Sequence, residues 1–243
     1  MKPVLQAHYL ALAMGLTSLA LLNSGGALSH PSSRSFNPIL LTQRPSVGNP
    51  DARRGSVGKG ICPDVTPPLT ALMPKPDATG VGGKTIAAHP TLWFYVPYTE
   101  SQGFLGTLSL EDEQGNSVYR TALRFPKTAG VMGVRVPPTI PALEVNKRYN
   151  WSFQVACADV PIKVAGWIQR VAPSPKLTQQ LQAAKQVQQR AAVFLSNDIW
   201  FDGLTLFAEE RKTGRQKASV TDAWGKLMND IELGDIAPEP MSP

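Results

Sequence analysis

Residues Tyr149 to Cys157 alternate large apolar side chains with small or polar ones, and this stretch restricts the fold more than any other. Its large side chains are Tyr149, Trp151, Phe153, Val155 and Cys157. A period of two is that of a β-strand with one face in a core. We therefore expect a central strand of a sheet here.

The loop before this strand carries a second signal. Leu143 lies six residues before Tyr149. A leucine, a short turn and a tyrosine that opens a strand resemble the tyrosine corner of Greek-key sandwiches, where the hydroxyl bonds to nearby backbone. The pair Leu143 and Tyr149 indicates an immunoglobulin-like sheet.

Further short strands are expected on both sides of the central one. They cover residues 69–73, 91–98, 106–111, 117–125, 130–136 and 162–171. Frequent turn signals separate them, and seven or eight short strands are typical of a sandwich. The sequence predicts an antiparallel immunoglobulin-like β-sandwich over residues 62–172.

The period changes to that of helices over residues 174–235. A first apolar stripe starts after Ser174 and runs to Leu195, a second follows Asp198 as its cap, and a third follows a capping box at Ser219. We expect about three C-terminal helices that pack on each other or on the sandwich.

The first residues have the features of a targeting signal. The segment Leu10–Leu22 is almost wholly apolar, and Ala27 with Ser29 fits the small-residue cleavage rule. As a helix its thirteen residues span about 20 Å, short of the roughly 30 Å hydrocarbon core. We predict a Sec-type signal peptide at 1–29, with an uncleaved anchor as the alternative, and no later membrane span. A Pro/Gly/Ser-rich tether is expected at 30–61. A secretory signal also predicts a periplasmic or extracellular location for the protein.

Two cysteines, Cys62 and Cys157, are the complete set in the chain. In an oxidising compartment an isolated pair is usually bridged, so we expect a disulfide, with two buried free thiols as the alternative.

Only His30 and His89 follow the leader, and neither has ligand spacing to a cysteine. We expect no metal and no cofactor.

Several functional classes are excluded by pattern. The net charge of +6 is scattered, with no basic run longer than Arg53–Arg54, so no nucleic acid is expected. The glycine-rich stretch Ala78–Thr85 resembles a phosphate loop but lacks the strand before it and the helix after it. We therefore interpret this stretch as a flexible turn and expect no nucleotide binding. No nucleophile with a base is recognised. The carboxylates of Glu111, Asp112 and Glu113 could serve a glycosidase or ligate calcium, but an acidic hairpin tip is more simply a solvated one. His89 precedes a proline at a strand entrance and is read as a turn or capping residue, so no catalytic residue is assigned.

Three aromatic residues are candidates for binding. If the strand of Trp93 flanks the central strand, Trp93, Tyr95 and Trp167 share an outer face around small polar side chains, which suits a sugar ring or a peptide. The favoured alternative is that the helical region covers this face. A third arrangement buries Trp93 in the core and turns Trp167 inward by a bulge at Gly166.

Seven stretches together resemble a cyanobacterial family of unknown function, domain-of-unknown-function family nine-two-eight. They are Cys62–Pro63, Leu69–Leu72, His89–Tyr98, Glu113–Arg120, Leu143–Trp151, Gly166–Arg170 and Ile199–Asp202. The resemblance implies an exported cyanobacterial protein, and it implies no reaction because the family carries none.

These observations together predict an exported, non-enzymatic envelope protein that acts as a protein-interaction module. The alternative is binding of carbohydrate, such as exopolysaccharide or peptidoglycan, through the aromatic face. A hydrolase is the third class and is disfavoured because the sequence shows no recognisable set of catalytic residues.

Overall fold

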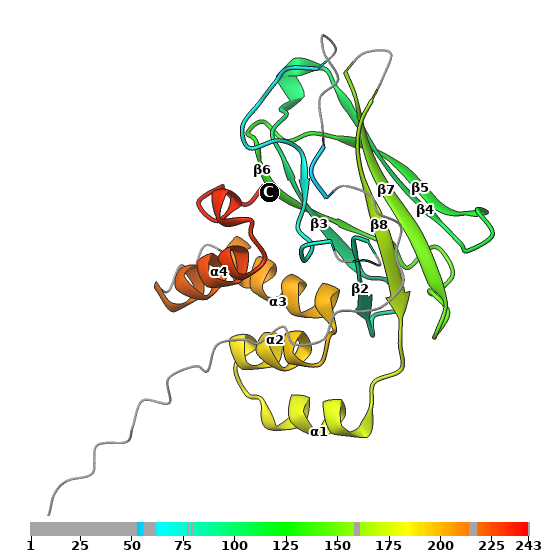
Figure 1. Cartoon of the computed structure of the whole chain (residues 1–243), viewed down its shortest axis with the longest axis vertical. Helices are drawn as coiled ribbons and strands as arrows, with labels where there is room; N and C mark the ends of the chain where they lie inside the picture. Colours follow the sequence, from blue (N-terminus) through cyan, green and yellow to red (C-terminus); the bar gives the residue numbers. More distant parts are fainter. Residues whose placement is uncertain are drawn as a thin grey trace, which may run out of the picture. The chain divides into compact units, whose positions relative to one another are not determined.

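A computed structural model describes residues 53–55, 62–76, 78, 80–157, 161–213 and 218–242. The expected signal peptide and nearly all of the expected tether lie outside these residues. The described part holds eight β-strands followed by four α-helices, with the helices on one side of the strands (Figure 1). The chain is therefore mainly β with a helical C-terminal region.

Five strands form a mixed sheet in the order β2-β8-β7-β4-β5. Their bounds are Gly82–Thr85 for β2, Ile162–Arg170 for β8, Arg148–Ala156 for β7, Leu105–Glu111 for β4 and Ser117–Arg124 for β5. β2 runs parallel to β8, and the other pairs are antiparallel. The predicted central strand, β7, is the middle strand of this sheet.

Three strands form a second, antiparallel sheet in the order β1-β3-β6, with bounds Thr70–Ala71, Thr91–Val96 and Gly130–Arg135. The ring of Phe94 lies 4.6 Å from that of Phe153 and 5.8 Å from that of Trp151, centroid to centroid. The inner faces of the two sheets therefore meet in one core.

The prediction that the strand of Trp93 flanks the central strand is wrong. β3 pairs with β1 and β6 instead. All but its first residue are buried, so both of its faces need cover. It obtains this by lying between the core that the two sheets share and helix α3.

The alternation in β7 has the expected consequence. Tyr149, Trp151, Phe153 and Val155 are each at most 4% exposed. The Tyr149 hydroxyl accepts a hydrogen bond from the Glu144 backbone N–H at 3.0 Å, just after the buried Leu143. This bond ties the preceding loop to the start of β7.

The glycine-rich stretch is not the flexible turn that its composition suggests, because Gly82 and Gly83 open β2. A β-carbon at Gly82 would overlap the indole of Trp167, its partner in the β2–β8 register. On Gly83 it would lie 2.9 Å from the Trp200 β-carbon. Glycine is needed here so that two tryptophans can approach the backbone closely.

The helices are α1 (Pro175–Ala183), α2 (Val187–Ser196), α3 (Trp200–Lys212) and α4 (Ala218–Asp230). The Ser174 hydroxyl accepts a hydrogen bond from the Leu177 N–H at 3.1 Å, as an N-cap does. The start of the first predicted helix is thus confirmed.

Three details of the helix prediction are wrong. The first predicted helix is two helices, because Ala184 is extended (φ −76°, ψ 110°) and Gln186 caps α2 together with Gln189. Asp198 does not cap α3; its φ is 64° and its carboxylate pairs with Lys84 at 2.8 Å. Ser219 lies inside α4.

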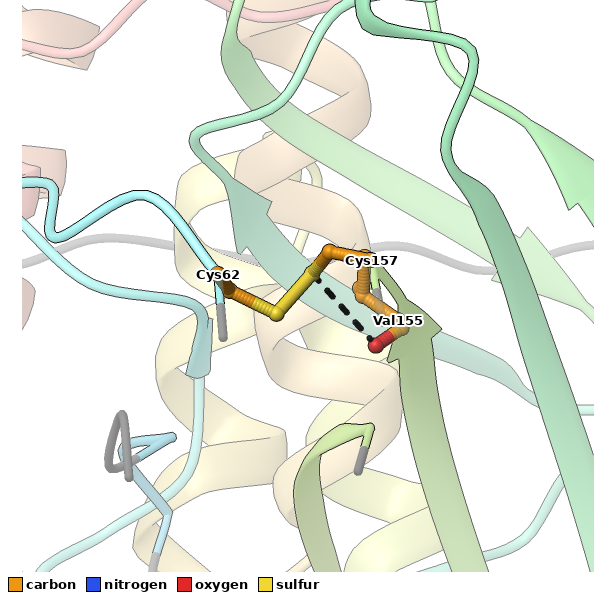
Figure 2. Close-up of a disulfide and its surroundings, with 3 residues drawn as sticks. All are labelled: Cys62, Val155 and Cys157. Atoms are coloured by element: carbon orange, nitrogen blue, oxygen red, sulfur yellow. Dashed lines mark hydrogen bonds between the residues drawn. A yellow bond between two sulfur atoms is a disulfide. The ribbon is translucent and has the colours of Figure 1, made fainter. Parts of the chain in front are cut away.

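A disulfide joins Cys62 and Cys157, whose Cα atoms are 5.4 Å apart (Figure 2). It links the segment before β1 to the residue that follows β7, across a separation of 95 residues. The Cys157 sulfur lies 3.8 Å from the Val155 carbonyl oxygen. The bridge therefore fixes the end of the central strand.

The disulfide predicts a large stability difference. Replacing both Cys62 and Cys157 by serine is expected to lower the free energy of unfolding by about 4–5 kcal/mol, because a loop of this length is released in the unfolded chain. Urea unfolding measures this loss. In the wild type, intact mass after alkylation without reductant should show no label; two labelled cysteines would contradict the bridge.

The packing of β2 predicts opposite effects for two glycines. Gly82→Ala is expected to cost about 1–3 kcal/mol of unfolding free energy, because a methyl group would overlap the Trp167 ring. Gly225→Ala in α4 meets no atom within 4 Å and should stabilise by about 0.5–1 kcal/mol. Equal stabilities for the two variants in urea unfolding would refute this account of β2.

Candidate functional site

The structure does not bring the three candidate aromatics onto one open face. Trp93 is 3% exposed, Tyr95 4% and Trp167 2%. Trp93 and Tyr95 belong to β3 in the three-stranded sheet, and Trp167 belongs to β8 in the five-stranded sheet. Their burial and their separation leave no shared surface for a sugar or a peptide.

Trp93 and Tyr95 alternate with Phe94, so they lie on the face of β3 that points away from the core between the two sheets. The Trp93 indole N–H donates to the Thr205 hydroxyl of α3 at 3.0 Å, so this helix covers Trp93, as the favoured alternative predicts. Burial, with the hydrogen-bonded carboxylate of Glu239 adding to it, raises the pKa of Tyr95 to about 12.

Trp167 lies over Gly82, with the Arg148 guanidinium 4.9 Å from its ring centroid. The β7–β8 register is continuous from Arg148 to Val155, with Gly166 opposite Trp151. The bulge considered at Gly166 is therefore absent. A β-carbon at Gly166 would lie 2.6 Å from the Trp151 ring, so that glycine makes room for the core tryptophan.

The motif Ile199–Asp202 fastens the helices to the sheets. The Trp200 indole N–H donates to the Leu72 carbonyl at 3.0 Å. The Asp202 carboxylate accepts from the Thr85 hydroxyl at 2.6 Å and from the Ile86 N–H at 3.2 Å. Buried hydrogen bonds of this kind are costly to leave unmade, so the motif has a structural role in docking α3.

Arg53 and Arg54, part of the scattered positive charge in the sequence, bond the segment before β1 to residues that follow α4. Arg53 is 8% exposed and donates to the carbonyls of Met73 (2.9 Å) and Ile231. Arg54 binds Asp235 through two hydrogen bonds of 2.7 and 2.8 Å. No sequence pattern distinguishes these arginines from solvated ones, because their C-terminal partners, Ile231 and Asp235, are more than 170 residues away in the chain.

The other polar candidates are explained by local structure. The Asp112 carboxylate accepts hydrogen bonds from Asn116 and from the Gln114 N–H, which hold its pKa below the ordinary value and close the β4–β5 hairpin. His89 Nε2 donates to the Ile140 carbonyl at 3.0 Å. Within the described ranges, no group of three or more His, Cys, Asp or Glu side chains could hold a metal ion.

A pocket of about 420 Å³ lies between α3 and the three-stranded sheet. One wall is a stripe of α3 made by the polar residues Asp202, Thr205 and Glu209 and by Leu206. The facing wall carries Thr85, His89, Thr91 and Arg135. Phe194 and Phe201 also line it. This is a concave site with apolar and polar groups of both signs, within the size range of about 300–1,000 Å³ for small-ligand pockets.

A second candidate surface is the outer edge of β5. This eight-residue strand pairs with β4 on one side and with no described strand on the other. Its exposed side chains include Arg120 and Arg124, which form no ion pair with another described residue. The edge offers unpaired backbone donors and acceptors to another chain.

Asp202 predicts a pH-dependent stability. Burial raises the pKa of its carboxyl above the ordinary 3.8, so the protonated form is favoured by the folded chain. The wild type should lose stability relative to Asp202→Asn as the pH rises above about 3.8, because ionisation then opposes folding.

Asp235 is the matched control for that experiment. Its hydrogen bonds with Arg54 hold its pKa below 3.8, so the wild type should gain stability relative to Asp235→Asn as the pH rises toward about 3.8, and this difference should stay constant at higher pH. Thermal unfolding of the three proteins between pH 2 and 7 tests both signs. A stability difference from Asp235→Asn that falls with rising pH, or one from Asp202→Asn that grows, would contradict the assignment.

Among the described residues, no helix has the length and apolar character needed to cross a membrane. Comparison with curated proteins gives no match. The family model described as Domain of Unknown Function (DUF928) matches residues 49–241, which is most of the chain. On that match, this chain is a member of the DUF928 family.

Proposed function

We propose that this protein is an exported, non-enzymatic interaction module of the cell envelope that binds an extended segment of a partner protein along β5. The observation that carries the proposal is the unpaired outer edge of β5. Addition of a strand to an exposed sheet edge is a common mode of peptide recognition. The main-chain hydrogen bonds supply affinity, and the alternating side chains supply specificity.

The core side of β5 supports this mode of binding. Tyr119 and Leu123 lie opposite Leu110 and Gly106 of β4, on the face that contributes to the core. Both are only half-buried, unlike Leu110, which is 1% exposed. An added strand would complete their burial with apolar side chains at alternate positions.

The outer side of β5 indicates the charge of the partner. Arg120 and Arg124 lie opposite Ser109 and Leu105, on the face away from the core. Arginine on an edge strand also discourages aggregation, which is the simpler account of these charges. Charge complementarity with these arginines nevertheless favours a partner strand in which acidic residues, facing outward, alternate with apolar residues that face the core.

Two features support export. The Cys62–Cys157 disulfide suits an oxidising compartment. The sequence of residues 1–29 has the pattern of a secretory signal. The carbohydrate alternative depends on Trp93, Tyr95 and Trp167, and their burial gives it no support here.

Selection of displayed peptides against the purified protein tests the proposal. We expect selected peptides to alternate apolar and acidic residues, and to protect β5 amides from hydrogen exchange. Combined Arg120→Glu and Arg124→Glu substitutions should weaken binding about tenfold or more, because attraction becomes repulsion. Lys163→Glu is the matched control, since Lys163 is exposed on the outer face of β8, away from this edge.

A backbone control separates strand addition from simple charge attraction. N-methylation of alternate amides in a selected peptide removes main-chain donors and leaves its charges intact, so it should abolish binding. Retained binding by the methylated peptide, or failure to select any peptide that protects β5, would overturn the proposal.

A further inference from the structure

We infer that the pocket between α3 and the three-stranded sheet binds a small zwitterion with an apolar side chain, such as a free amino acid or a dipeptide. The inference is independent of the proposed function. β5 is the outermost strand of the five-stranded sheet, whereas the sheet residues of this pocket come from β2, β3 and β6.

The acidic wall comes from one face of α3. Asp202, Thr205, Leu206 and Glu209 recur at the three- and four-residue spacing that places side chains on one side of a helix. Glu209 is exposed and has no ion-pair partner among the described residues. Asp202 and Thr205 already accept hydrogen bonds from Thr85, Ile86 and Trp93, so Glu209 is the carboxylate that this stripe presents to an ammonium group.

The opposite wall carries the cation. Arg135 of β6 lies directly across from Thr91 of β3 in the sheet register, so both side chains are on the face that turns toward α3. The Arg135 side chain is exposed and forms no ion pair with another described residue. A guanidinium binds a carboxylate through two parallel hydrogen bonds.

The charges of both walls favour a ligand of both signs. A simple anion would face the Glu209 carboxylate of α3, and a simple cation would face Arg135. Burial disfavours the ionised form of Asp202, which leaves Glu209 and Arg135 as the main opposed pair. Phe194 and Leu206 supply an apolar surface for the side chain of the ligand.

The simpler account is that Arg135 and Glu209 attract each other across an empty pocket. That account predicts no ligand, and it treats the two residues as surface charges worth little. Binding measurements on the full chain distinguish the two readings, because only a ligand site discriminates a zwitterion from its singly charged fragments.

The probes are L-leucine and glycyl-L-leucine, compared by calorimetry with 3-methylbutylamine and 4-methylpentanoate. At least one zwitterion should bind, and each singly charged fragment should bind about tenfold more weakly or worse, since a charge-assisted hydrogen bond contributes at least that factor. Absence of zwitterion binding at millimolar concentration, or equal binding of a fragment, would overturn the inference.

Two neutral variants locate the site. Glu209→Gln and Arg135→Gln should each weaken zwitterion binding about tenfold, because each removes one charged partner and preserves side-chain size. Glu210→Gln and Arg190→Gln are the matched controls, because neither residue lines the pocket or lies on β5. Binding that survives both pocket substitutions, or that falls equally with the controls, would refute this location. Because peptide binding at β5 is measured separately, either proposal can fail without the other.

Discussion

The contact between Trp200 of α3 and Gly83 of β2 is the interaction on which the packing of the helices against the sheets depends. The Trp200 β-carbon lies above Gly83 of the five-stranded sheet, and its indole N–H bonds to the carbonyl of Leu72, which follows β1 of the three-stranded sheet. One side chain of α3 therefore joins the helical layer to both sheets. A larger residue at Gly83 would push the helix away, and the hydrogen bond to Leu72 would be lost with it.

The position of α3 has consequences for function. The helix covers Trp93, so an aromatic face that looks like a binding surface in the sequence is an internal interface. The same helix leaves a pocket beside Asp202 and Glu209, where its polar stripe faces the end of the three-stranded sheet. Binding is therefore expected beside the helix and at the free edge of β5.

Much of the strand layout follows from local pattern. The period of two in β7, the aromatic run of β3 and the β4–β5 hairpin are each set by neighbouring residues. The wrong predictions for the glycine-rich stretch and for Asp198 have one cause, which is that the partners of these residues are distant in the sequence. Gly82 and Gly83 look like a loop because their role is to accommodate Trp167 and Trp200, which are distant in the chain. Asp198 looks like a helix cap, but Lys84 is its partner in the folded chain.

The sequence by itself determined that this chain is mainly β with a helical end, that β7 is central and that Cys62 and Cys157 are suited to a bridge. Periodicity, turn residues and cysteine count are local or compositional, so they can be read without coordinates. Only the tertiary structure decided which sheet holds β3, what covers Trp93, and which residues line the pocket. Those outcomes depend on side chains far apart in the sequence, such as Arg135 and Glu209, lining the same pocket, which no local pattern encodes.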